Sequence, residues 1–131
     1  MKLQAFTIDP RKIETGEWME DLPGCGDLRI HTKGINNAAY RELQAKLIAA
    51  VPRAERRRGL SPETNKRIQT TCLVETCLLG WENLDGIKFT KAKASELLHD
   101  PQYEPLLDAC IVAASWVADG RADDIKDAGK N

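Results

Sequence analysis

The chain has 131 residues, of which 42% are hydrophobic, and its 19 basic and 20 acidic side chains give a formal net charge of -1. This length and composition predict one globular domain and exclude wholesale disorder. The charge balance is unlike that of a dedicated nucleic-acid binder, which usually has a clear basic excess. No apolar run approaches the ~20 residues of a membrane-spanning helix, and the N-terminal residues lack a signal-peptide pattern, so we expect no membrane association and a cytoplasmic location.

The N-terminal part of the chain has the pattern of a β-hairpin. Residues 17–20 and 28–31 alternate polar and apolar side chains, as half-buried strands do, and residues 21–27 between them are rich in turn formers. The pattern predicts that residues 1–34 form a hairpin region that packs on the rest of the protein. The side chains expected to face the core are Trp18, Leu28 and Ile30.

Two segments with helical periodicity follow the hairpin. The first opens at Asn36 or Asn37, whose side chain would cap the helix, and it ends at Pro52. The second opens at Ser61, a capping hydroxyl that a proline follows, and it ends at Gly80. Because the second helix is apolar over much of its circumference, we expect it near the centre of a bundle.

Two more helices are predicted after a connection over residues 81–89. Thr90 caps a short helix that stops at Asp100, before a proline. The last helix has the most regular three-four spacing of apolar residues, namely Tyr103, Leu106, Leu107, Cys110, Ile111, Ala114, Val117 and Ala118. Residues 119–131 are polar and predict a disordered tail. The predicted fold is mainly α: a small bundle of about four helices over residues 35–118 with an N-terminal β-hairpin.

The residue types that usually carry chemistry are scattered along this sequence. Three cysteines lie inside apolar helical patterns, where a free thiol behaves as a small hydrophobe, and they are Cys72, Cys77 and Cys110. His31 and His99 have no ligand partner nearby in the sequence, and turn chemistry accounts for the glycines beside Cys25. We therefore predict no catalytic residue, no metal site, no cofactor and no enzyme activity.

The concentrated charge feature of the sequence is a basic stretch made of Arg53, Arg56, Arg57 and Arg58. Arginines of this kind can bind phosphates. They follow a helix C-terminus, however, where the helix dipole favours cations by ~0.3–1 kcal/mol each, and no aromatic residues interleave them to stack bases. The pattern therefore favours a solvated loop between helices over a nucleic-acid site.

A series of short stretches up to about Arg121 points to a known family. The most distinctive is Gly80-Trp81-Glu82-Asn83-Leu84-Asp85-Gly86. The others are Thr7-Ile8-Asp9-Pro10, Gly16-Glu17-Trp18, Leu28-Arg29-Ile30, Gly34-Ile35-Asn36-Asn37-Ala38-Ala39-Tyr40, Phe89 and Glu96-Leu97-Leu98. In series they resemble the tail assembly chaperones of long-tailed, non-contractile (siphovirus-type) bacteriophages or prophages.

This resemblance implies a binding function in the cytoplasm of a bacterial host. Such chaperones bind the tape measure protein and keep it soluble while tail tube proteins polymerise around it, and they are absent from the mature virion. Many also exist as a longer form made by a translational frameshift, and the polar tail would suit such a junction. The resemblance leaves open a homo-oligomer, and the alternatives are a structural minor tail or head–tail joining protein and a small nucleic-acid-binding protein that uses residues 53–58.

A partner surface follows from the chemistry of the client. A long helical protein has apolar stripes that aggregate when uncovered, and a helical domain can cover one of them in helix-in-groove fashion. We expect the contact surface to come from whatever the core leaves uncovered of Leu73, Val74, Leu106, Ile111 and Val117. Trp116 lies off the main stripe of its helix and either anchors the partner or packs under the hairpin, whereas Trp81 is expected to fill the core at its turn.

Overall fold

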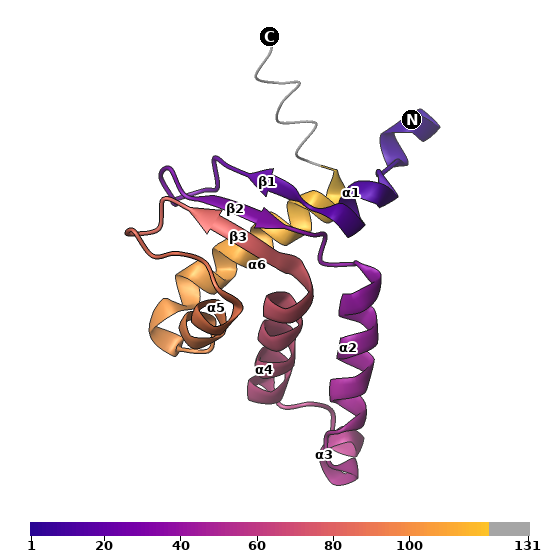
Figure 1. Ribbon diagram of the computed structural model, residues 1–131. Helices are drawn as coiled ribbons and strands as arrows, with labels where there is room; N and C mark the ends of the chain where they lie inside the picture. Colours follow the sequence, from indigo (N-terminus) through magenta and orange to yellow (C-terminus); the bar gives the residue numbers. More distant parts are fainter. Residues whose placement is uncertain (121–131) are drawn as a thin grey trace.

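The computed structural model describes residues 1–120 of the chain. Three strands form one antiparallel sheet in the order β1-β2-β3, and the longest helix lies against it (Figure 1). The elements are η1 (Leu3–Phe6), α1 (Pro10–Thr15), β1 (Glu17–Met19), β2 (Arg29–Thr32), α2 (Ala38–Ala49), α3 (Arg53–Arg58), α4 (Pro62–Cys72), η2 (Leu73–Cys77), β3 (Leu78–Glu82), α5 (Lys91–Leu98), η3 (Pro101–Tyr103) and α6 (Glu104–Asp119). The predicted mainly α fold with an N-terminal β-hairpin is confirmed.

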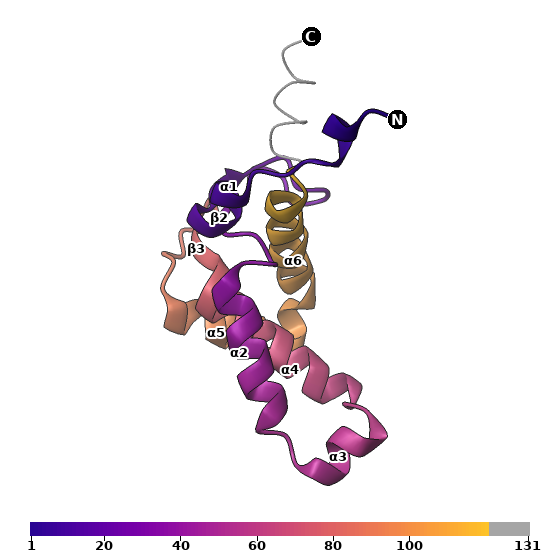
Figure 2. The same ribbon diagram turned by 90° about the vertical axis from the view of Figure 1, so that its right-hand side faces the viewer.

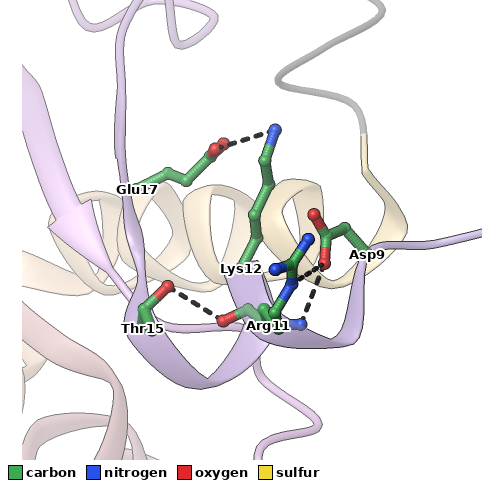
Figure 3. Close-up of polar contacts among 5 residues, drawn as sticks. All are labelled: Asp9, Arg11, Lys12, Thr15 and Glu17. Atoms are coloured by element: carbon green, nitrogen blue, oxygen red, sulfur yellow. Dashed lines mark hydrogen bonds and ion pairs between the residues drawn. The ribbon is translucent and has the colours of Figure 1, made fainter.

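A short helix, α1, precedes the sheet, where the sequence predicted only irregular or extended structure. Asp9 caps it by accepting a hydrogen bond from the Arg11 amide at 3.0 Å, and a proline occupies its first position. Figure 3 shows this cap together with the Thr15 hydroxyl that donates to the Arg11 carbonyl and the ion pair between Lys12 and Glu17. The sequence analysis missed this helix because six residues are too few to show the repeat of apolar side chains that indicates a helix.

The hairpin forms at the predicted place, but one of its side chains points the other way. Ile30 lies opposite Met19, and both are buried, as is Leu28. Trp18 lies opposite His31, and their rings stack with centroids 4.9 Å apart on the opposite face of the sheet. The prediction that Trp18 faces the core is therefore wrong. Residues directly opposite in an antiparallel pair share a face of the sheet. Because Ile30 in β2 faces the core, its partner Met19 in β1 faces the core as well, and Trp18 faces away from it.

Helices α2, α3 and α4 form an arm that projects from the sheet (Figures 1 and 2). The predicted caps are confirmed: the Asn37 side chain accepts from the Tyr40 amide and the Ser61 side chain accepts from the Thr64 amide. The basic stretch of residues 53–58, predicted to be a loop, is the short helix α3 at the far end of this arm.

The second predicted helix ends earlier than its apolar pattern suggested. It stops at Cys72, continues as one π-helical turn, η2, and becomes strand β3 at Leu78, so the predicted end at Gly80 is wrong. Residues after Cys72 are apolar on nearly every side, and such a run fits a buried strand as well as a helix. Pairing with β2 favours the strand over the helix here, since Trp81 lies opposite Ile30 in the sheet.

The hydrophobic core lies where α6, the sheet, η2 and α5 meet. Trp81 is buried there, as predicted, and its indole N–H donates to the Ile87 carbonyl at 2.8 Å while its ring packs edge-on against Phe89. Within residues 1–120, no helix combines the length and apolar character that a bilayer crossing requires. Most of the predicted disordered tail, residues 121–131, lies outside the described residues.

Candidate partner-binding surface

Three of the six residues predicted to bind a partner are part of the core. Leu73, Val74 and Val117 have exposed fractions of 0%, 1% and 3%. Leu73 and Val74 belong to the π-helical turn η2, which lies against α6 and α5. The core therefore leaves almost none of these three side chains uncovered, and the contact surface expected from uncovered apolar residues does not come from them in this fold.

The other three predicted residues, Leu106, Ile111 and Trp116, are partly exposed on α6 but do not form one surface. Ile111 is five positions along the chain from Leu106 and five from Trp116. At about 100° per residue, Ile111 therefore lies about 140° around the helix from each of them. Trp116 packs against the core and keeps part of its ring accessible. The binding roles of these residues stay predictions.

A row of side chains, of which all but the buried Ala109 are exposed or partly exposed, runs along the Trp116 side of α6. Its members recur at three- and four-residue spacing, which places them on one side of the helix. They are Pro105, Asp108, Ala109, Val112 and Trp116, and we call them the α6 strip. A groove of about 240 Å³ lies beside the first four of these residues, and its other wall comes from the β1–β2 connection through Leu22, Pro23 and Cys25. This groove combines apolar walls with one carboxylate, that of Asp108.

The N-terminal residues carry the most exposed large apolar side chains of the described chain. Leu3 is 83% exposed, Phe6 is 67% exposed and Ile8 is 47% exposed. Side chains three apart in a 3-10 helix eclipse one another, so Leu3 and Phe6 project from the same side of η1. We call Leu3, Phe6 and Ile8 the N-terminal patch. Sequence reasoning missed it, because three apolar residues before a proline are too few to show a period.

The N-terminal segment that carries this patch lies near the C-terminal end of α6 (Figures 1 and 2). A hollow of about 370 Å³ lies between the N-terminal segment and the last residues of α6, and it is lined by Gln4, Ala5, Thr7, Ile8, Asp9, Asp119 and Gly120. Ile8 is the member of the N-terminal patch that lines this hollow, whereas no member of the α6 strip lines it. The N-terminal patch and the α6 strip are therefore two separate candidate surfaces.

Helix α1 fixes the point from which the N-terminal patch projects. The Glu14 carboxylate accepts from the Ala38 amide with its two oxygens at 3.0 and 3.2 Å, at the start of α2. The carbonyl of Ile13 accepts from the Gly34 amide at 2.9 Å. These bonds tie α1 to the beginning of the arm, so the exposed residues before it begin from an anchored helix.

The buried thiols of the core are held in their protonated form. Burial raises the pKa of Cys110 to about 12 and is the largest cause that raises the pKa of Cys77 to about 11. Since the thiolate is the reactive species, both side chains act as small apolar groups at neutral pH. In residues 1–120, no cluster of three or more His, Cys, Asp or Glu side chains is arranged to hold a metal ion.

A second groove, of about 330 Å³, lies between α4 and the start of α6. Lys66 Nζ and Glu104 Oε1 meet there at 2.6 Å, and both side chains are partly exposed. Leu98 and Leu107 form part of its apolar floor. The charged groups of this groove join two helices to each other, which suits a structural role.

The four arginines of the basic stretch are gathered at the end of the arm. Arg53, Arg56, Arg57 and Arg58 are all exposed, and the Arg56 Nε–H donates to the Val51 carbonyl at 3.0 Å. The structure thus brings together every residue that the sequence analysis assigned to a basic patch, at a place far from the N-terminal patch (Figure 2).

Comparison with known proteins identifies a prophage protein. Residues 35–131, which are more than half of the chain and include the arm, β3 and α6, match the family model described as YdaY prophage protein. The chain belongs to this family. No curated protein and no solved structure matches the chain. The N-terminal patch and the hairpin precede the matched region.

Proposed function

We propose that this prophage protein is a tail assembly chaperone that binds the tape measure protein of its phage, keeps it soluble and promotes tail tube assembly in the host cytoplasm. The observation that carries the proposal is the N-terminal patch, in which Leu3 and Phe6 are 83% and 67% exposed on the same side of η1. Contiguous exposed apolar side chains mark interaction sites more often than single ones do.

The chemistry of the patch suits a client with apolar stripes. Full burial of one large apolar side chain contributes roughly 1.5–3 kcal/mol, and association costs translational and rotational freedom that offsets much of this gain. A patch of three such side chains therefore supports weak binding by one copy. Weak binding suits a chaperone that coats a long client with many copies and leaves as the tube subunits arrive.

The α6 strip supplies a second contact of matching shape. From Pro105 to Trp116 it extends about 16 Å at a rise of 1.5 Å per residue, which is the length of three turns of a client helix. The groove beside it, with Leu22 and Val112 on opposite walls, fits an apolar side chain of such a helix. Helix-in-groove binding uses side chains three and four residues apart in the client, as an extended helical tape measure protein provides them.

Co-expression with the tape measure protein of the same prophage tests the proposal. We expect this chain to move the tape measure protein from the pellet into the soluble fraction, and a Leu3→Ser/Phe6→Ser variant to lose most of this effect while it keeps its own thermal stability. Tyr103→Ser is the matched control, since Tyr103 is 42% exposed at a site outside the proposed surface. An unchanged amount of soluble tape measure protein with the unmodified chain refutes the proposal.

Mass spectrometry of purified virions separates this function from a structural one. A chaperone is expected in the infected cell and absent from the particle. Many copies in the finished particle would instead favour a minor tail or head–tail joining protein. Peptides from infected cells would also report whether a longer, frameshifted form exists, because such a form departs from the given sequence at the frameshift and continues with different residues.

A further inference from the structure

The charges of this protein are segregated between the arm and the rest of the molecule. The arm, residues 38–72, has eight basic and three acidic side chains and thus a net charge of +5. Residues 1–37 and 73–120, which we call the body, have eight basic and 14 acidic side chains and a net charge of -6. The near-neutral total of the chain therefore hides a strongly basic projection on an acidic body.

The end of the arm concentrates this positive charge. Four of the six residues of α3 are arginines, and all four are exposed. Within residues 1–120, no acidic side chain forms an ion pair with Arg53, Arg57 or Arg58. Arg56 is anchored by its bond to the Val51 carbonyl at 3.0 Å.

The acid within α3 is directed away from these arginines. Glu55 Oε1 accepts from the Thr64 hydroxyl at 2.6 Å and from the Ser61 hydroxyl at 3.3 Å, at the start of α4. The hydrogen bond from Thr64 is the largest of the effects that lower the pKa of Glu55. Glu55 thus ties α3 to α4 and leaves the guanidinium groups facing solvent.

The shape of the tip suits a nucleic acid. Figure 2 shows α3 at the end of the arm, away from the sheet and α6. A helix with its side chains is ~10–12 Å across, and the major groove of B-form DNA is ~12 Å wide. Arg53 and Arg57 are one turn apart and lie on the same side of α3, and guanidinium groups bind phosphate oxygens in bidentate fashion.

We infer that the basic tip of the arm is a binding site for the phosphate backbone of a nucleic acid. The apolar content of the tip decides between this ligand and an acidic protein. Interface cores between proteins are enriched in aromatic and apolar anchors, and the sole apolar side chain of α3 is that of Ala54. Phosphate binding needs no such anchor, because counterion release drives it. The acidic body is repelled by the same backbone, so contact is confined to the tip.

Binding of this kind has a measurable salt dependence. Each neutralised phosphate contributes a slope of about -0.9 to the logarithm of affinity against the logarithm of salt concentration. Three to four arginine contacts predict a slope of about -3 for duplex DNA. The site is independent of the N-terminal patch, so failure of either proposal leaves the other in place.

Fluorescence anisotropy with a labelled DNA duplex, over about 50–200 mM salt, tests the inference. We expect binding that weakens along the stated slope, and a loss of more than about tenfold in Arg57→Glu/Arg58→Glu. Lys2→Glu/Lys88→Glu is the matched control, because it changes the net charge equally at exposed sites outside the arm and is expected to bind within about twofold of the parent chain. Arg57→Lys/Arg58→Lys retains the charge and is expected to retain most of the slope.

Three results would overturn the inference. These are no binding of the duplex or of the corresponding single strand at low salt, equal losses in the tip and control variants, and binding of poly-glutamate as tight as that of DNA. The last would show a site for acidic polymers in general. Thermal melts of each variant, followed by circular dichroism, verify that the helix content and stability of the chain are unchanged, so that a lost affinity reports on the tip.

Discussion

The side chain of Asn37 joins the arm to the body, and its removal is expected to destabilise both. Its Oδ1 accepts from the Tyr40 amide at 2.9 Å and caps α2. Its Nδ2 donates to the Gly34 carbonyl at 2.8 Å and to the Thr76 carbonyl, in the π-helical turn, at 3.2 Å. Asn37 is 1% exposed, so water cannot replace these partners.

The magnitude for Asn37→Ala follows from the bonds that are lost. Loss of an N-cap costs typically ~1 kcal/mol, and each of two further hydrogen bonds contributes about 0.5–1.5 kcal/mol. We expect the free energy of unfolding to fall by about 2–4 kcal/mol. Thr90→Ala is the control: Thr90 caps α5 through the Lys93 amide at an exposed site, and its loss is expected to cost no more than about 1 kcal/mol.

Asn37→Asp separates the cap from the bonds to the body. The aspartate keeps an oxygen for the Tyr40 amide, but its second oxygen faces the carbonyls of Gly34 and Thr76. A buried carboxylate there has a folded-state pKa above its unfolded value. The folded state then binds more protons over the interval between the two values, so stability falls as pH rises through it. The variant is therefore expected to be more stable near about pH 5 than near about pH 8.

Urea denaturation followed by tryptophan fluorescence measures these differences. The reasoning fails if Asn37→Ala costs less than Thr90→Ala, or if Asn37→Asp has the stability of the parent chain at the higher pH. Either result would mean that the contacts of Asn37 are replaced elsewhere and that the arm is held to the body by apolar packing alone.

Three further outcomes follow from the packing and the pKa shifts. Gly34→Ala would place a Cβ 2.9 Å from Ile13 Cγ2 and is expected to cost about 1–3 kcal/mol, whereas Gly80→Ala meets atoms no closer than 3.7 Å and is expected to change stability by less than about 0.5 kcal/mol in thermal melts. Burial lowers the pKa of His31, so the unfolded state binds more protons below about pH 6.5 and stability should fall as pH falls there; His31→Gln should remove that part of the dependence. Cys110, with its raised pKa and no exposed surface, should resist iodoacetamide at about pH 8 until urea unfolds the chain, as peptide mass spectrometry would report.

Local signals in the sequence predicted those parts of the fold that local chemistry determines. The caps of α2 and α4 depend on Asn37 and Ser61, which bond within their own turn. The hairpin of β1 and β2 depends on alternation and on turn formers between the strands. The side of Trp18 was not predictable in this way, because a partner residue in β2 decides which face of β1 turns inward.

The parts that sequence reasoning missed depend on distant partners or on very short segments. Strand β3 forms because β2 lies alongside it, and an apolar run alone does not distinguish that pairing from a longer helix. Of the predicted partner-binding residues, Leu73, Val74 and Val117 are buried by elements remote in the sequence. The basic stretch was found from composition, but its place at the end of the arm required the structure.

The connection between β2 and β3 has a consequence for how this fold can change. Thr32 and Leu78 are paired neighbours in the sheet, and the Lys33 amide donates to the Cys77 carbonyl at 2.9 Å. The segment between Thr32 and Leu78, which contains the arm, therefore begins and ends at neighbouring positions of the sheet. Adding one turn to both α2 and α4 would move the tip of the arm about 5.4 Å farther from the sheet and leave the pairing of the strands unchanged. The distance between the sheet and the tip of the arm can therefore change in evolution by whole helical turns, without a change in the register of the sheet.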